Sequence, residues 1–119
     1  MSRNWILFAQ DVEDACRKIC RYTQGLDQAA FLRQEVVYDA TLRNLEIIGE
    51  AAKAIPDEAR QRFPHINWKG VVGLRDVLAH AYFALDDDTL WDIVTNKVPE
   101  LLLVMEGIRE DLPHEDGET

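Results

Sequence analysis

The sequence predicts an all-α fold, an antiparallel up-down bundle of four to five helices. Apolar residues recur at three- and four-residue steps over long stretches, and no stretch alternates apolar and polar residues for long enough to predict a strand. The chain has 119 residues, 47% of them hydrophobic, which suits one globular domain. A domain of this size buries roughly two-thirds of its unfolded surface, so it needs no disulfide or metal for stability.

The first helix is expected from about residue 4 to 23. Its apolar stripe comprises Trp5, Phe8, Val12, Ala15, Cys16, Ile19 and Tyr22. Gly25 is placed to end this helix, and Asp27 can cap the next one. A long second helix then runs from about 28 to 55 and is closed by Pro56.

The second half of the chain predicts two further helices. A short helical turn follows Pro56, and Asn67 is a suitable cap for a third helix from about 68 to 83. A fourth helix is expected from about 88 to 111. Pro99 lies inside its pattern and should kink the helix or shift its start, because proline has no N–H to donate.

Charge restricts the partners. The formal net charge is −9, and residues 106–119 hold six acidic residues against one basic residue. We expect residues 112–119 to be a flexible acidic tail after a helical domain of residues 1–111. The acidity argues against long-range attraction of nucleic acid, so an RNA site must be local. The basic residues available for it are Arg43, Lys53, Lys69 and Arg75.

The cysteines and histidines of the sequence predict neither a disulfide nor a metal site. Cys16 and Cys20 are four residues apart and are expected to be free thiols in a reducing compartment. The three histidines are scattered without paired acidic ligands, so no metal and no cofactor is expected. No apolar run approaches a membrane span, and the N-terminus lacks a cleavage-site pattern. These features predict a cytoplasmic protein without a membrane partner.

The run RDVLAHAY carries the candidate chemistry. It places Arg75, Asp76, His80 and Tyr82 within an otherwise apolar helical stretch. Arginine is a permanent cation whose fork fits phosphate oxygens, and histidine can exchange a proton near neutral pH. Together they suit phosphodiester cleavage without a metal. From the residues alone an alternative stays open, in which Arg75 and Asp76 form a solvated face and His80 is a satisfied helix-end histidine.

Three blocks of sequence resemble the HEPN superfamily in its HepT-like branch. R-D-V-L-A-H-A-Y reads as its R-x4-H-x-Y motif, R-N-L-E-I-I-G-E-A from Arg43 to Ala51 resembles its second-helix signature, and P-H-I-N-W-K-G-V-V-G-L-R-D from Pro64 to Asp76 resembles the lead-in to the motif. The similarity runs from about the N-terminus to residue 108. The bare R-x4-H pattern is weak, but three blocks in the right order make a specific signal.

The resemblance implies a metal-independent endoribonuclease, the toxin of a type II/VII-like toxin–antitoxin pair. His80 would be the general base or acid and Arg75 would hold the phosphate, with Asp76 in support. The RNA 2′-hydroxyl would attack the phosphate, so DNA would not be cut. The resemblance also implies a homodimer. That fits the spacing, because residues five apart do not share one face of a regular helix, so Arg75 and His80 need a distorted helix end or groups from two chains.

The same resemblance implies an antitoxin, an MNT-type nucleotidyltransferase that attaches AMP to Tyr82. The alternative for Tyr82 is an aromatic packed at a helix end. Arg43 and Glu50 are supporting candidates near the motif or the dimer cleft, or simply members of intrahelical ion pairs. Gly49 inside the second helix predicts a close helix approach. The alternative function is a non-catalytic HEPN module that binds nucleotide or serves as the partner subunit of a nucleotidyltransferase.

Overall fold

The computed structural model of the chain describes residues 4–76 and 86–111, and every regular element in these ranges is helical. The predicted all-α class is therefore confirmed. In chain order the elements are α1 (Trp5–Thr23), α2 (Gln28–Arg33), α3 (Glu35–Ala54), α4 (Asp57–Arg60), α5 (Trp68–Gly73), α7 (Asp87–Asp92), the π-helical turn η1 (Ile93–Lys97) and α8 (Val98–Asp111). None of the helices in these ranges is long and apolar enough to cross a membrane.

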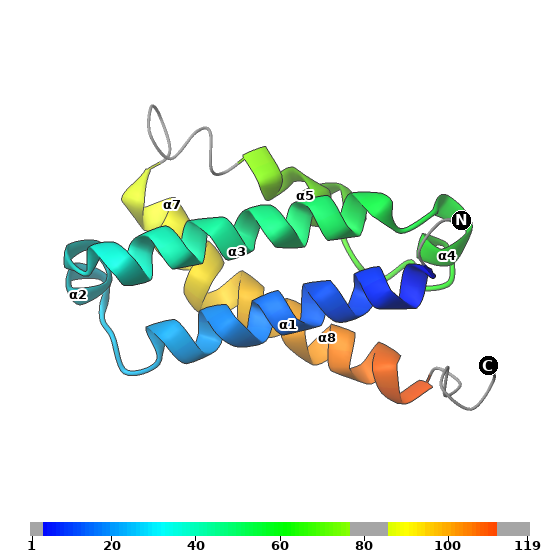
Figure 1. Cartoon of the computed structure of the whole chain (residues 1–119), viewed down its shortest axis with the longest axis horizontal. Helices are drawn as coiled ribbons and strands as arrows, with labels where there is room; N and C mark the ends of the chain where they lie inside the picture. Colours follow the sequence, from blue (N-terminus) through cyan, green and yellow to red (C-terminus); the bar gives the residue numbers. More distant parts are fainter. Residues whose placement is uncertain (1–3, 77–85, 112–119) are drawn as a thin grey trace.

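The two longest helices form the centre of the bundle. α1 and α3 lie side by side and antiparallel, α8 packs on α1, and α5 packs on α3 (Figure 1). The core between them is apolar, as the three- and four-residue spacing predicts. Its most completely buried large side chains include Val12, Ile19, Phe31, Leu42, Leu45, Ile48, Leu90 and Met105.

Several helix ends are where the sequence predicts them. Gly25 has a φ of 78°, the left-handed conformation that glycine adopts without strain, just after α1 ends. The Asp27 carboxylate accepts a 2.8 Å hydrogen bond from the Ala30 amide at the start of α2. The Asn67 side chain accepts a 3.1 Å bond from the Gly70 amide at the start of α5.

The predicted second helix is wrong as a single element. It is divided at Gln34, whose backbone has a φ of −92° and a ψ of 91°, into α2 and α3. The reason is tertiary. Phe31 is fully buried, with its ring 5.5 Å from that of Tyr38 and 5.2 Å from that of Trp91. The break lets α2 deliver this aromatic side chain into the core.

The predicted third and fourth helices are also interrupted. α5 ends at Gly73 and Leu74 forms a turn, after which Arg75 and Asp76 are helical again. The remainder of that predicted helix, residues 77–83, lies outside the described residues. In the fourth, the Val98 amide donates to the Ile93 carbonyl five residues back. This π turn directly precedes Pro99, which cannot donate to a helix ladder, so the predicted distortion at Pro99 is confirmed.

Candidate active site

Arg75 and Asp76 are the members of the motif that the structure describes. Both follow the Leu74 turn and both are exposed. His80 and Tyr82 lie outside the described residues. The site is therefore built from Arg75 and the surface of α3 on which it lies.

Gly49 of α3 is the contact point. A methyl group at this position would lie 2.8 Å from the Arg75 Cβ and 2.9 Å from the Val72 carbonyl oxygen, which is closer than real Cβ atoms come. Only a hydrogen in place of a side chain lets the two backbones approach so far. The close helix approach predicted at Gly49 is confirmed. It fixes where the Arg75 side chain leaves the backbone.

Charged residues flank this contact along α3. Glu46 and Lys53, three residues before Gly49 and four after it, lie on the same side of the helix as Gly49, and Glu50 is its neighbour in sequence. Lys53 and Glu50 are exposed, and Glu46 is half-buried. One carboxylate and one ammonium group, those of Glu46 and Lys53, therefore lie on the side of α3 on which the Arg75 backbone packs.

Arg43 makes an intrahelical ion pair, which was one of the two alternatives expected for this residue. Its guanidinium donates to the Glu46 carboxylate at 2.8 Å, with 64% of the Arg43 side chain exposed. An exposed pair of this spacing contributes about 0.3–0.5 kcal/mol, so it leaves Arg43 free to exchange partners. Arg43 lies six residues before Gly49, almost two turns and about 9 Å along α3. The structure therefore does not bring Arg43 to the Arg75 backbone. Glu50 follows Gly49 in the sequence, but its side chain leaves α3 about 100° around the helix from the Gly49 contact.

Arg75 itself has no carboxylate within ion-pairing distance among residues 4–76 and 86–111, Asp76 included. This distinguishes it from Arg17, Arg43 and Arg60, which all make such pairs. An exposed guanidinium without a carboxylate keeps its five donors for another anion, and a phosphate suits its fork. Arg75 is thus equipped to bind a phosphate group.

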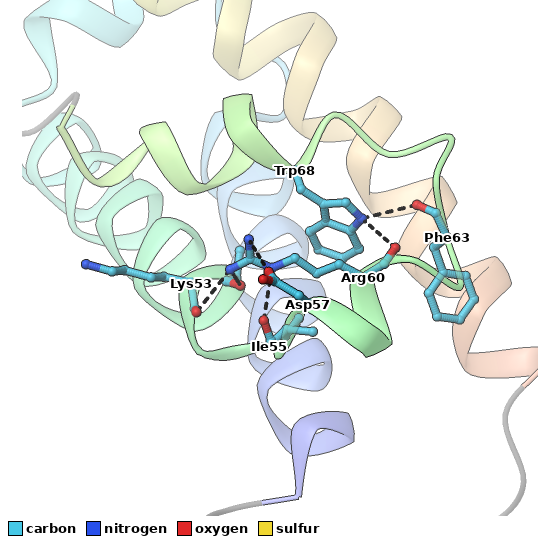
Figure 2. A network of polar contacts seen from close by, with 7 residues as sticks. Lys53, Ile55, Asp57, Arg60, Phe63 and Trp68 are labelled. Carbon is cyan, nitrogen blue, oxygen red and sulfur yellow. Dashed lines mark hydrogen bonds and ion pairs between the residues drawn. The ribbon is translucent and has the colours of Figure 1, made fainter.

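A hydrogen-bond network around Arg60 positions α5 on α3. The sequence did not predict this network. Arg60, in α4, donates from Nε to the Ile55 carbonyl at 2.9 Å, and from Nη2 to the carbonyls of Ala52 at 3.1 Å and Lys53 at 3.0 Å (Figure 2). These carbonyls lie at the C-terminal end of α3, where helix carbonyls lack the usual N–H partner four residues on. The Ala52 carbonyl also accepts a 3.2 Å hydrogen bond from the Ile55 amide. The signal in the sequence was a basic residue one turn after the Pro56 that ends α3.

Trp68 connects the same network to α5. Its indole Nε1 donates to the carbonyls of Arg60 and Phe63, each at 3.1 Å (Figure 2). Trp68 is also the first residue of α5, so these bonds join the end of α3, the α4 turn and the start of α5. The path of α5 along α3, and with it the position of Arg75, depends on this junction.

The other titratable clusters belong to the packing of α1. Arg17 donates to the buried Glu13 at 2.7 Å and to Glu106 of α8 at 2.8 Å, which ties α1 to α8. Burial raises the pKa of the Cys16 thiol to about 12, and burial also raises the pKa of Cys20. Both cysteines are free. His65 is exposed, and among the described residues no group of three or more His, Cys, Asp and Glu side chains could hold a metal ion.

Comparison with known proteins agrees with the resemblance in the sequence. The family model described as "Ribonuclease HepT-like" matches residues 12–108, which is most of the chain. The chain belongs to the HepT-like ribonuclease family. The match includes the described part of the Arg75 site, the Gly49 contact and the Arg60 network.

Relatives of this HepT-like chain carry ribonuclease names. "Putative RNase MJ0127" of Methanocaldococcus jannaschii is 37% identical over 109 residues, covering 92% of this chain and 90% of the relative. "Probable ribonuclease HepT" of Thermococcus cleftensis is 34% identical over 110 residues, covering 92% of this chain and all of the relative. "Putative RNase TTE0752" of Caldanaerobacter subterraneus is 32% identical over 94 residues, covering 79% of this chain and 84% of the relative. No solved structure matches the HepT-like chain significantly.

Proposed function

We propose that this HepT-like chain is a metal-independent endoribonuclease, the toxin of a type II/VII-like toxin–antitoxin pair acting in the cytoplasm. One observation supports this most. Arg75, in the R-x4-H-x-Y run of a chain from a ribonuclease family, is exposed, has no carboxylate partner among the described residues and is fixed on α3 at Gly49. A cation held in this way is suited to an RNA phosphate.

The reaction assigned to the motif is transfer within the RNA. His80 takes the proton of the 2′-hydroxyl, the 2′-oxygen attacks the adjacent phosphorus, and the bond to the 5′-oxygen breaks as that oxygen gains a proton. The products are a 2′,3′-cyclic phosphate and a 5′-hydroxyl. Arg75 stabilises the negative charge that develops on the phosphate oxygens. DNA has no 2′-hydroxyl and is not a substrate.

Asp76 and Glu50 have supporting roles in this proposal. Asp76 follows Arg75 and is exposed beside it, where it can orient His80, the residue four positions on. Glu50 adjoins the Gly49 contact and can position Arg75 through its charge. Arg43 is further away and paired with Glu46, so its support is less direct.

The active form in this proposal is a homodimer. Arg75 and His80 are five positions apart, which a regular helix would place about 140° apart, and the observed turn at Leu74 comes before both residues. If a cleft combines groups from two chains, Arg75 and His80 need not lie on the same face of one helix. This supports the dimer that the family resemblance implies.

The partner in this proposal is an MNT-type nucleotidyltransferase antitoxin that transfers AMP to Tyr82. The added phosphate would repel RNA phosphates beside Arg75 and His80. Incubating the toxin with its neighbouring nucleotidyltransferase and ATP tests the assignment by mass spectrometry. The parent chain should gain AMP and lose activity, and Tyr82→Phe should do neither. A Tyr82→Phe chain that is still fully neutralised by AMP transfer would rule out Tyr82 as the acceptor.

A second function is favoured by the acidity of the chain. A net charge of −9 opposes RNA binding at long range but is no obstacle to a small nucleotide or a basic protein. In this alternative the chain is a non-catalytic nucleotide-binding module or the partner subunit of a nucleotidyltransferase.

Expression in a bacterial host distinguishes the two functions. A toxin produced alone arrests growth, and co-expression of the antitoxin restores it. His80→Ala, produced at the same level, should permit normal growth. A parent chain that is well expressed, folded and harmless would favour the binding module.

A further inference from the structure

Two exposed lysines border the seam between α3 and α5. The two helices are antiparallel, because α5 begins at the junction with the C-terminal end of α3 and the chain has returned to Gly49 by Arg75 (Figure 1). Gly49 of α3 lies against the Val72 carbonyl of α5, so these two residues mark the line of closest approach. Lys53 of α3 and Lys69 of α5 are exposed beside this line.

Both lysines lie on the solvent side of the seam. On α3, Ala52 and Lys53 come three and four residues after the contact glycine, which places them about 60° to one side of it and about 40° to the other. On α5, Val71 and Lys69 likewise lie on opposite sides of Val72. Ala52 and Val71 are buried and mark the core side. Lys53 and Lys69 therefore share the opposite side.

The two lysines are also at nearly the same level along the seam. Lys53 is four residues after Gly49, about 6 Å along α3, and its side chain extends away from the hydrogen-bond network at the end of that helix (Figure 2). Lys69 is three residues before Val72, about 4.5 Å along α5 and in the same direction, since the helices are antiparallel. We call Lys53 and Lys69 the lysine pair. It lies about one helical turn from the point at which Arg75 is held.

No carboxylate of the described residues forms an ion pair with the lysine pair. Glu50, three residues before Lys53, is close enough in sequence to do so, but makes no such contact. Residues 59–75 hold four basic residues and no acidic one, in a chain whose net charge is −9. Two positive charges placed together without a carboxylate repel each other, so an anion bound between them is favoured.

The surface between the lysine pair and Arg75 is bare. Gly73 lies one turn after Lys69 on the same face of α5, and a Cβ there would have no neighbour within 4 Å. In the opposite direction from Arg75 the seam is acidic, with Glu46 on α3 and Asp76 after α5. An extended anion bound at Arg75 can therefore continue over Gly73 to Lys69, and like-charge repulsion opposes the other course.

We propose that the lysine pair binds the RNA backbone at phosphates next to the one held by Arg75, so that the strand leaves the site over Gly73 toward the C-terminal end of α3. The proposal rests on the proposed function for its substrate and adds the surface along which that substrate lies. An ammonium group binds phosphate as a point charge and does not read bases. The lysine pair therefore sets the course of the RNA and not its sequence.

Salt-dependent binding tests the proposal. The probe is a single-stranded 2′-O-methyl RNA, which has no free 2′-hydroxyl and is not cut, and fluorescence anisotropy follows its binding between about 50 and 200 mM NaCl. K53A/K69A should weaken binding about tenfold or more at the lowest salt. It should also lower the slope of log Kd against log salt by about 0.7 for each lysine removed, because each phosphate contact releases counterions. K53R/K69R keeps both charges and should bind as the parent does.

K18A/K97A is the matched control. Lys18 of α1 and Lys97 of η1 are exposed lysines on other elements, so this variant has the same net charge as K53A/K69A. It should keep the parent slope and bind within about twofold of the parent. A K53A/K69A chain with the parent slope, or an equal loss of affinity in both double variants, would overturn the proposal.

Single-turnover cleavage separates binding from chemistry. K53A/K69A should raise the protein concentration that gives half the maximal rate and leave the maximal rate within about twofold, whereas Arg75→Ala lowers the maximal rate. A K53A/K69A chain whose half-maximal concentration equals that of the parent would contradict the proposed course of the RNA.

Failure of this surface and failure of the ribonuclease proposal give different results. A chain that passes the salt test but cleaves no RNA retains the surface and refutes the enzyme. A chain that cleaves RNA, and whose K53A/K69A variant binds with the parent affinity and slope, retains the enzyme and refutes the surface.

Discussion

Gly49 and Arg75 meet backbone to backbone where the segment after α5 crosses α3. A side-chain carbon at residue 49 would lie 2.8 Å from the Arg75 Cβ and would collide with the Arg75 amide nitrogen. Because residue 49 is a glycine, the backbone of Arg75 can pack directly against the backbone of α3. Only the guanidinium end of the side chain is left to respond to a ligand.

The first prediction follows from this contact. Gly49→Ala gains about 1 kcal/mol of helix propensity, but the added carbon overpacks a backbone that cannot easily move, at a cost of about 1–3 kcal/mol. We expect the free energy of unfolding, measured by urea denaturation, to fall by up to about 2 kcal/mol. Cleavage activity should fall as well, because Arg75 is displaced.

Gly107→Ala is the matched control, because a Cβ there has no neighbour within 4 Å and the residue lies in α8. This variant should raise the free energy of unfolding by about 0.5–1 kcal/mol through helix propensity alone. Equal stabilisation by both substitutions would show that the Gly49 contact is not tight.

The second prediction separates chemistry from stability at Arg75. Arg75→Ala keeps the Cβ that packs on Gly49, so the free energy of unfolding should change by no more than about 0.5 kcal/mol. The RNA cleavage rate should fall about 10²–10³-fold with the loss of the phosphate-binding group. Arg75→Lys should recover only part of the rate, because lysine keeps the charge but lacks the fork.

Lys18→Ala removes one exposed positive charge from α1 and is the control for net charge. Rates measured in single turnover should not change in this variant. An Arg75→Ala rate within a few-fold of the parent would exclude Arg75 from the reaction.

The third prediction concerns the Arg60 network. Arg60→Met keeps the apolar part of the side chain and removes the donors to three carbonyls at the end of α3. Hydrogen bonds from a charged group contribute about 1.5–3 kcal/mol, and we expect a loss in that range in urea denaturation. Asp57→Asn is the control, since its contact with Arg60 is 3.8 Å long and Asp57 is 88% exposed. That change should stay within about 0.5 kcal/mol.

The fourth prediction is a pH dependence of stability. Burial, with smaller contributions from Cys20 and Glu13, raises the pKa of the Cys16 thiol to about 12 from 9.0. The unfolded chain therefore loses this proton first as the pH rises. The free energy of unfolding is unaffected below about pH 8 and falls between pH 9 and 12, by at most about 1.4 kcal/mol per pH unit.

Urea denaturation at pH 8 and pH 10.5 measures this effect. Cys16→Ala should lose most of the difference, whereas Cys20→Ala should lose only a smaller part, because Cys20 is half-buried and burial is the main cause of the raised pKa of Cys16. The same slope in the parent and in Cys16→Ala would assign the pH dependence to other groups.

The sequence predicted several helix ends well because those ends are local. Asn4, Asp27 and Asn67 cap with their own side chains, and Gly25 and Pro56 end helices through their own backbones. The close contact at Gly49 could also be predicted, because glycine inside a long helix is costly without a reason.

The breaks at Gln34 and Leu74 could not be predicted, because neither residue breaks helices by itself. The chain breaks at Gln34 because Phe31 is buried against Tyr38 and Trp91, which are seven and sixty positions away from Phe31 in the sequence. The contact with Trp91, at a separation of sixty residues, leaves no periodic signal.

The sequence proposes residue types for the site but does not give their geometry. The motif singles out Arg75, but its lack of a carboxylate partner among the described residues is visible only in three dimensions. The ion pair between Arg43 and Glu46, in contrast, could be predicted from helical spacing alone. The Arg60 network depends on the path of the chain after Pro56, which spacing does not give.

Cleavage of an end-labelled RNA in the presence of EDTA, by the purified protein and by His80→Ala, tests the central claim most directly. The account predicts products that end in a 2′,3′-cyclic phosphate with the parent chain and none with His80→Ala of equal fold and dimerisation. Cleavage by His80→Ala at the parent rate, or no cleavage by the folded parent dimer, would contradict it.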